Sequence, residues 1–180
     1  MRSLLKFILS LAVAFLLMLA FRALGFTIYS VDGEGLEPDF INGDRVMVNR
    51  WSYGLRTGGN RLFSYGRLCR QPMQRGDIVA YDDPTDSLNR RVLFGRLSAL
   101  PGDTVRYEGN LELVPGLVNC ADADYYWIQS LNEENQMDSR QFGYISEKSI
   151  IGRAFLIVYS HPSDSSVLRG FRNDRFLLLK

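Results

Sequence analysis

Residues 31–40 read Val-Asp-Gly-Glu-Gly-Leu-Glu-Pro-Asp-Phe, and residues 43–48 read Gly-Asp-Arg-Val-Met-Val. A Gly-Asp pair ahead of alternating apolar residues is typical of a turn that leads into a short strand, because glycine accepts a positive φ and aspartate caps nearby amides. A long apolar run precedes this stretch, and strand-forming sequence follows it. The stretch therefore marks the junction between two parts of the chain.

The part before the junction has the character of a membrane anchor. Residues 7–21 are apolar except for Ser10, and Lys6 and Arg22 can snorkel, so a helix over residues 4–28 can span a bilayer. Basic residues precede the run and acidic residues follow it, so the positive-inside rule places the N-terminus in the cytoplasm. We predict a single-pass anchor at 1–28 and an exported domain at 29–180. The alternative is a signal peptide cleaved after residues 23–25, which would export the same domain.

The part after the junction is rich in signals for short strands. Residues with β-branched and aromatic side chains, separated by Gly, Asn, Asp and Pro, predict strands at 45–49, 77–81, 91–99, 104–108, 111–114, 125–129 and 150–159. Glu108-Gly109-Asn110 predicts a hairpin. Residues 51–74 are expected to be irregular, and 175–180 to form either an edge strand or a membrane-facing tail. The predicted fold class is mainly β, an antiparallel domain behind one N-terminal transmembrane helix.

Composition narrows the classes of function. The chain has 180 residues, a formal net charge of +1 and 46% hydrophobic residues, so it can bury a core and offers no electrostatic basis for binding nucleic acid. Cys69 and Cys120 fit no metal-ligand spacing, and no metal or cofactor site is expected. In an exported domain the two cysteines either pair, which would contribute roughly 4 kcal/mol in the chain-entropy model, or are small buried thiols.

Four blocks occur in a fixed order behind the apolar run. The first spans 31–56, and the second spans 74–84 and begins Gln-Arg-Gly-Asp-Ile-Val. The third, 94–105, contains Leu-Pro-Gly-Asp at 100–103, and the fourth, 138–154, contains Asp-Ser-Arg at 138–140. Each block alone is ordinary turn chemistry. Together, in this order, they resemble the type I signal peptidase (leader peptidase) family.

This resemblance implies a serine nucleophile, a neutral lysine base and, in some members, a second serine that holds the oxyanion. In this chain the nucleophile position is Gly35, the base position is Gly95 and the oxyanion position is Gly33. A hydrogen cannot attack a carbonyl or accept a proton, so the resemblance implies a member that lacks the catalytic dyad. The family motif is retained at Pro38, Asp77, Arg96, Pro101, Gly102, Asp103, Asp138, Ser139 and Arg140.

The fourth block has lost part of the family pattern. The family's Gly-Asp-Asn-Arg is replaced by Ser-Leu-Asn-Glu at 130–133, and a later serine is replaced by Gln136. We expect Asp138 and Arg140 to form a charge-assisted pair that orders the segment near the site.

A relocated active site is the first alternative. Lys148, Lys180 and His161 are the side chains of the exported part that could act as neutral bases. Ser30, Ser98 and Ser139 are conceivable nucleophiles, but none has a visible partner in the sequence, and the members of a catalytic triad are rarely adjacent along the chain.

The favoured function is therefore that of a membrane-anchored, signal peptidase-like pseudoenzyme, placed in a bacterial inner membrane with its domain in the periplasm. Its former substrate groove, with Leu36, Phe40, Val79 and Tyr81 as expected walls, would bind exported peptides, an active signal peptidase or a partner in a membrane complex. One alternative is an active peptidase with altered catalytic groups, in which change of Ser30, Ser98, Ser139 or Lys148 would abolish cleavage. Another is a purely structural subunit. Under the favoured reading, Gly35→Ser with Gly95→Lys would restore some hydrolysis.

Overall fold

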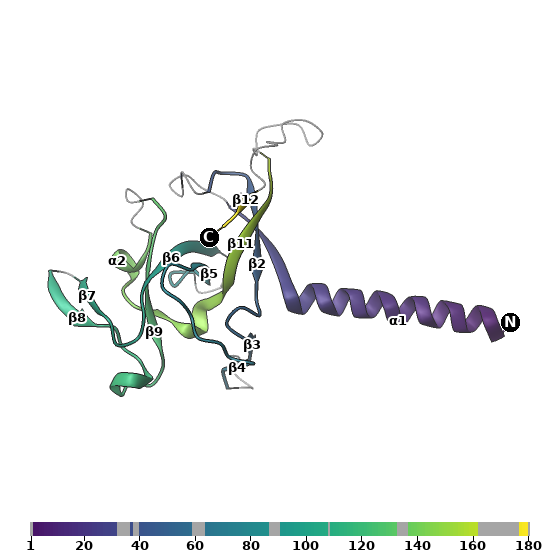
Figure 1. Ribbon diagram of the computed structural model, residues 1–180, viewed down its shortest axis with the longest axis horizontal. Helices are drawn as coiled ribbons and strands as arrows, with labels where there is room; N and C mark the ends of the chain where they lie inside the picture. The colour runs from purple at the N-terminus through teal and green to yellow at the C-terminus, as the bar shows by residue number, and fades with distance from the viewer. Residues whose placement is uncertain are drawn as a thin grey trace.

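An N-terminal helix and an antiparallel β domain make up the protein. The computed structural model describes residues 2–31, 37, 40–58, 64–86, 91–107, 109–132, 137–161 and 177–179. Helix α1 (Arg2–Gly25) is rich in Leu and Ala, which favour helix, and it extends away from the β domain (Figure 1). No helix among these residues meets the length and apolarity needed to cross a bilayer.

The boundary between helix and sheet lies earlier than the sequence pattern predicts. The predicted helix over 4–28 is wrong at its C-terminal end, because α1 ends at Gly25 and strand β1 (Phe26–Ser30) begins at the next residue. β1 pairs antiparallel with β2 (Asp44–Asn49), in a register that runs from Phe26↔Asn49 to Ser30↔Arg45. Thr27, Ile28 and Tyr29 have side chains that favour strands, and they pair with Val48, Met47 and Val46 of β2.

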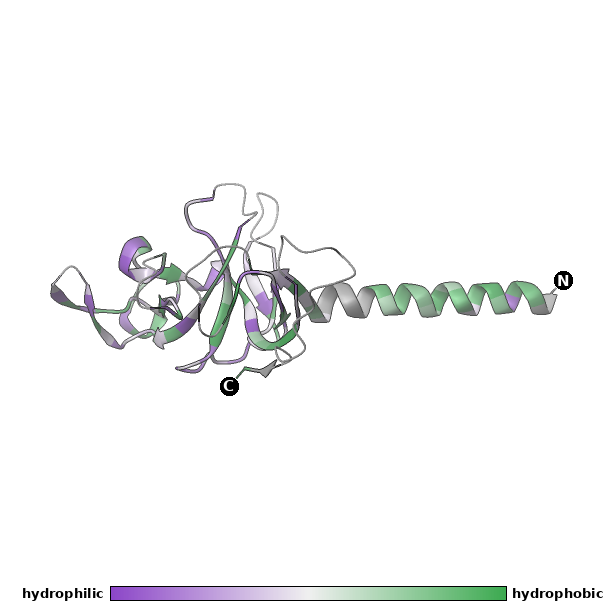
Figure 2. Cartoon of the chain, turned by 90° about the horizontal axis from the view of Figure 1, so that it is seen from above, coloured by the Kyte–Doolittle hydropathy of each residue, from purple (hydrophilic) through white to green (hydrophobic). Residues whose placement is uncertain are grey.

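The side chains of residues 4–19 of α1 are all exposed. They are apolar except for Lys6 and Ser10, so the helix is apolar on every side (Figure 2). Phe7 and Leu17, for example, expose 65% and 66% of their surface. A helix that is hydrophobic all round is normally covered by protein or lipid.

One sheet forms the centre of the domain, and all its strand pairs are antiparallel. Its order confirms the prediction of a mainly β, antiparallel domain. After β1 and β2 it continues with β11 (Ile150–Ser160), β5 (Ile78–Asp82), β6 (Val92–Ala99), β9 (Tyr125–Gln129) and β10 (Ile145–Ser146), and β12 (Leu177–Leu178) also pairs with β11. The predicted edge strand near the C-terminus is thus present.

Two hairpins flank the sheet. β7 (Thr104–Tyr107) and β8 (Asn110–Leu113) form the predicted hairpin, with Gly109 at a φ of 85°. β3 (Leu55–Thr57) and β4 (Gly66–Leu68) form the second, inside the stretch expected to be irregular. That expectation is wrong because two three-residue strands are too short to show an alternating pattern. The short helices are η1 (Leu117–Asn119), α2 (Ser139–Phe142) and η2 (Glu147–Ser149).

Two clusters of buried side chains lie on opposite faces of the central strands. Ile78 and Ala80 of β5 belong to cluster I, and Val79 and Tyr81 belong to cluster II, because neighbouring residues of a strand face opposite sides. The other buried residues of cluster I are Val31, Phe40, Val46, Val48, Phe94, Ile151, Ala154 and Ile157. The other buried residues of cluster II are Tyr53, Met73, Leu97, Tyr126, Ile128, Ile145 and Ile150.

The two cysteines fit neither of the expected arrangements. Cys69 and Cys120 are free and exposed, so they form neither a disulfide nor a pair of buried thiols. Both lie in turns with positive φ, 54° and 66°, which places their side chains at the surface.

Candidate functional site

The site begins at Gly95, the position that the sequence resemblance assigns to the family's lysine. Gly95 lies in the middle of β6, pairs with Val79 of β5 and is buried. A Cβ atom at Gly95 would lie 2.6 Å from Ile128 Cγ2 and 2.8 Å from the Gln129 carbonyl oxygen of β9. Real Cβ atoms essentially never come so close to such neighbours. The backbone of β9 therefore occupies the space through which a lysine side chain would leave β6.

The segment 137–142 packs beside this position and is held by a buried carboxylate. The Asp138 side chain is fully buried and accepts hydrogen bonds from the Ser130 and Arg140 backbone N–H groups, both at 2.8 Å. The Arg140 guanidinium also donates to it, with Nη2 at 2.8 Å and Nε at 3.0 Å from Oδ2. The expected Asp138–Arg140 pair is thus present, and it ties α2 to the end of β9.

Ser139 is part of the same framework and is not available as a nucleophile in this conformation. Its side chain is buried, and its Oγ accepts a hydrogen bond of 2.9 Å from the Ile128 backbone N–H. Because Ile128 also closes the space at Gly95, Ser139 fixes the strand that excludes a side chain from the base position.

Ser130 is a residue that the sequence pattern showed only as a departure from the family. It directly follows β9, whose register with β6 ends at the pair Arg96↔Gln129. Its hydroxyl is buried and has no hydrogen-bond partner within the described part of the chain. Its backbone N–H is held by Asp138. This buried hydroxyl therefore has no basic side chain bonded to it within that part of the chain.

The three expected groove residues that the structure describes are core residues. Phe40 is 1% exposed and packs edge-on against Phe94, with ring centroids 5.4 Å apart, while Val79 and Tyr81 are fully buried. These three side chains therefore do not form an open groove wall in this conformation, which corrects the expectation. Leu36, and with it the motif positions Gly33, Gly35 and Pro38, lie outside the described residues.

Tyr81 connects β5 to the segment 137–142. Its hydroxyl donates to the Met137 carbonyl oxygen at 3.4 Å. Burial raises the pKa of Tyr81 well above its ordinary value, and the negative charges of Asp138 and Asp83 raise it further. The tyrosine therefore stays protonated and serves as a donor at any physiological pH.

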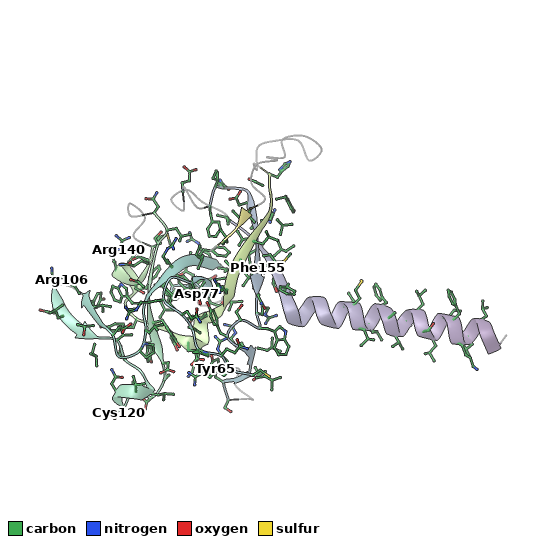
Figure 3. The ribbon with its side chains drawn as sticks, viewed as in Figure 1. Tyr65, Asp77, Arg106, Cys120, Arg140 and Phe155 are labelled. Carbon is green, nitrogen blue, oxygen red and sulfur yellow. The ribbon has the colours of Figure 1, made fainter. Side chains whose placement is uncertain are left out.

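Asp77 organises the other end of β5. Its Oδ2 accepts from the Tyr53 hydroxyl at 2.8 Å and from the Gln74 backbone N–H at 3.2 Å, and its Oδ1 lies 3.2 Å from Arg153 Nε. Desolvation, followed by the hydrogen bond to Asp77, raises the pKa of Tyr53. Asp77 lies at the centre of the domain (Figure 3). This motif residue thus joins β5, β11 and the turn at 53.

The Leu-Pro-Gly-Asp motif is a tight turn, as its composition predicts. Gly102 has a φ of 88° and donates to the Val114 carbonyl at 2.9 Å, and Pro101 precedes it. Asp103 Oδ2 accepts from the Leu100 backbone N–H at 2.6 Å, and Asp103 Oδ1 pairs with Arg75 at 2.6 Å. The Leu100 N–H bond, with a further contribution from Arg75, lowers the pKa of Asp103. Arg96 of the same block is exposed on β6.

The described residues that were candidates for a relocated dyad lie on different elements. Lys148 is exposed, and its Nζ lies 5.9 Å from the centre of the Tyr65 ring. Ser98 lies on β6 in a polar hollow lined by Arg75, Asp103 and other side chains. Ser30 lies on β1, and His161 follows β11, with its backbone N–H bonded to the Gly43 carbonyl.

The sequence pattern did not predict a buried ion pair between Arg67 of β4 and Glu147 of η2. The side chain of Arg67 is 1% exposed, and its Nε lies 3.1 Å from Glu147 Oε1. Its guanidinium also donates to the carbonyl oxygens of Gly54, Glu147 and Ile150. Nothing in the pattern of residues 51–74 distinguishes this arginine from its neighbours, because its partners come from η2 and β11.

Comparison with known proteins extends over both the helix and the β domain. The signal peptidase family, peptidase S26, matches residues 4–116 and 112–159. The chain is similar to signal peptidase IB of Staphylococcus aureus, with 26% identity over 187 residues that cover 84% of this chain and 87% of that protein. It is also similar to a probable signal peptidase I-2 of Synechocystis sp., with 27% identity over 153 residues that cover 73% of this chain and 62% of that protein. The chain therefore belongs to the signal peptidase family, peptidase S26.

Proposed function

We propose that this chain is a non-catalytic member of the signal peptidase family, held in a membrane by α1, that binds exported peptide segments or a membrane-complex partner through the former substrate groove. The observation that carries the proposal is the packing at Gly95. Both positions of the implied dyad are glycine, and at the base position β9 lies too close to admit even a Cβ atom. The loss of the base is therefore built into the packing of the sheet.

The retained motif residues support a role as scaffold. Asp77, Asp103 and Asp138 each hold a turn or a strand end through backbone amides and an arginine. Hydrogen bonds to charged groups contribute about 1.5–3 kcal/mol each, so these contacts stabilise the fold whether or not it is catalytic. A fold can persist while its chemistry is lost, because the two depend on different residues.

The surface of α1 supports the membrane attachment. Residues 4–19 expose apolar side chains in every direction, and the Ser10 hydroxyl is satisfied within the helix by the Phe7 carbonyl at 2.8 Å. These 16 residues measure about 24 Å along the axis, whereas the hydrocarbon core is about 30 Å thick. The proposal therefore also places the flanking sequence of α1, which includes Ala20-Phe21 and Ala23-Leu24, in lipid.

Binding requires that the former groove remain accessible to an extended peptide. Phe40 and Tyr81 are buried, so the proposal places the groove walls elsewhere, at the ends of β5 and β6. Peptides that bind such a site by adding a strand gain affinity from main-chain hydrogen bonds, which need no catalytic side chain.

The test uses the full chain, purified in detergent, and a labelled synthetic peptide with an apolar run followed by Ala-x-Ala. We expect saturable binding by fluorescence anisotropy and no cleavage above buffer between pH 7 and pH 10. Cleavage that disappears on change of Ser30, Ser98 or Lys148 would contradict the proposed inactivity. If the chain does not bind this peptide and no membrane partner co-purifies with it, the proposed binding role is contradicted.

A further inference from the structure

The edge of β11 beyond the end of β5 is occupied by the last described residues of the chain. At Arg153, β11 has β2 on one side and β5 on the other. At Leu156 and Ile157, β2 still holds the first side, and β12 pairs with the second through Leu156↔Leu178 and Ile157↔Leu177. β12 therefore continues the position of β5 along the same edge, beside β11 (Figure 1).

Main-chain contacts hold the described C-terminal residues to this edge. The Leu179 N–H donates to the Phe155 carbonyl oxygen at 2.9 Å. Because backbone groups of successive strand residues point to opposite sides, the N–H of Leu178 faces away from β11. Each backbone hydrogen bond contributes about 0.5–1.5 kcal/mol net, so a strand of two or three residues is held weakly by pairing alone.

Apolar side chains surround the same edge. Leu179 is partly buried and packs against cluster I, which includes Ile157. Phe155 packs against Phe26 of β1, with ring centroids 5.7 Å apart, and lies near the base of α1 (Figure 3). An extended apolar segment fits this edge, because main-chain pairing supplies affinity and alternate side chains meet apolar surface.

The chain's own segment has the advantage of a covalent tether. Residues 161–176 connect β11 to β12 in the sequence. A tether of this length gives an effective concentration in the mM range, so the segment occupies the edge even if its intrinsic affinity is about 0.1 mM. A free segment of equal affinity would then bind the intact chain about tenfold more weakly than it binds an empty edge.

We propose that the edge of β11 at residues 155–157 is a second peptide-binding site, separate from the former substrate groove, that accepts an extended leucine-rich segment of another polypeptide. The chain's own residues 177–179 occupy it and regulate access. An apolar segment that binds this edge more tightly than residues 177–179 displaces those residues from β11.

A matched pair of proline variants tests this site in the full chain. Leu179→Pro removes the N–H that donates to Phe155, whereas Leu178→Pro removes an N–H that faces away from β11, a position at which edge strands tolerate proline. The probe is a labelled peptide of sequence Arg-Phe-Leu-Leu-Leu-Lys, measured by fluorescence anisotropy in detergent. The control is the same peptide with proline in place of its third leucine. Any anisotropy change that it gives measures partition of the peptide into detergent micelles.

We expect Leu179→Pro to bind the probe about tenfold more tightly than the unchanged chain, and Leu178→Pro to behave like the unchanged chain. A variant that ends at residue 174 should match Leu179→Pro and retain the circular dichroism spectrum of the β domain. Equal binding by all the variants, binding of the proline-bearing peptide, or no binding by a folded truncated chain would each overturn the proposal. An excess of unlabelled Ala-x-Ala peptide should leave binding of the probe unchanged, which separates this edge from the former groove; displacement of the probe by that peptide would overturn the assignment to β11.

Discussion

Gly95 shows how the packing around one residue can exclude a side chain. Its neighbours Ile128 and Gln129 are contributed by β9, and Ser139 holds the Ile128 N–H in place. A side chain at residue 95 would have to move backbone atoms, whereas a side chain at most surface positions moves only other side chains. The strand pairing therefore resists the return of lysine.

A methyl group at Gly95 should be sufficient to destabilise the domain. We expect Gly95→Ala to lower the free energy of unfolding by about 1–3 kcal/mol, the usual cost of overpacking a core. Gly66→Ala is the control, because its Cβ would have Thr57 Oγ1 as nearest neighbour at an ordinary 3.5 Å. Urea unfolding of both variants, followed by tryptophan fluorescence, measures the difference. Equal stability would show that β9 relaxes without cost.

The same packing changes the expectation for restored catalysis. The resemblance alone implies that Gly35→Ser with Gly95→Lys would recover some hydrolysis, but the close approach of Gln129 to residue 95 prevents the lysine from taking its place. We therefore expect no cleavage of an Ala-x-Ala peptide by the folded double variant. Measurable turnover, lost again on Gly95→Met, would contradict this.

Asp103 makes the turn before β7 sensitive to acid. Its folded-state pKa is lowered below the ordinary value of 3.8, so its ionised form stabilises the fold above that pH, and the contribution is lost as pH falls through the folded pKa. We expect Asp103→Asn to be less stable than the unchanged chain at pH 7. The gap in urea midpoint should shrink as pH falls below about 4. A gap that stays constant down to pH 2 would contradict this assignment.

Sequence reasoning identified some of these residues and not others, for a physical reason. Asp138 and Arg140 are two positions apart, and Leu-Pro-Gly-Asp is a local turn, so their contacts follow from neighbouring residues. The constraint at Gly95 depends on β9, and the burial of Phe40 depends on Phe94. Such contacts arise only when distant strands pair, and a single sequence does not show them.

At the scale of elements, long alternating strands were predictable and short or context-dependent ones were not. The predicted strands at 125–129 and 150–159 coincide with β9 and closely with β11, because their β-branched and aromatic residues are continuous. β1 directly follows an apolar helix, so its apolar residues prolong the helical pattern. β3 and β4 depend on tertiary contacts, above all those of Arg67.

The hairpin β3–β4 should depend on the buried pair Arg67–Glu147. Glu147→Gln leaves the Arg67 charge buried with carbonyl partners but without its carboxylate, so we expect a loss of about 3 kcal/mol in the free energy of unfolding. Lys148→Gln, at the exposed neighbour, should change it by less than about 0.5 kcal/mol. Thermal unfolding of the two variants side by side measures the contrast. Similar values would mean that Arg67 is sufficiently held by the three carbonyl groups.

At the scale of the whole molecule, α1 and the hairpin of β7 and β8 lie at opposite ends of the long axis (Figure 1). The apolar helix at one end and the β domain at the other define the long axis of the protein. If α1 lies in a bilayer, the β domain stands on one side of it, and the basic residues Arg2 and Lys6 assign the other side to the cytoplasm. The native thiols offer a direct measure of this topology, because Cys69 and Cys120 are exposed on the β domain.

We expect a membrane-impermeant maleimide to label the chain in intact spheroplasts of a bacterial host, and the chain to stay with the membrane after carbonate extraction. Cys120 lies at a surface far from α1 (Figure 3), so lipid does not shield it from the reagent. The Cys69→Ser/Cys120→Ser variant, with no thiol left, is the control for labelling specificity. Labelling only after lysis would place the domain in the cytoplasm and contradict the positive-inside assignment. Release by carbonate would show that α1 is covered by protein instead of lipid, and the exposed apolar surface of residues 4–19 would then mark a subunit interface.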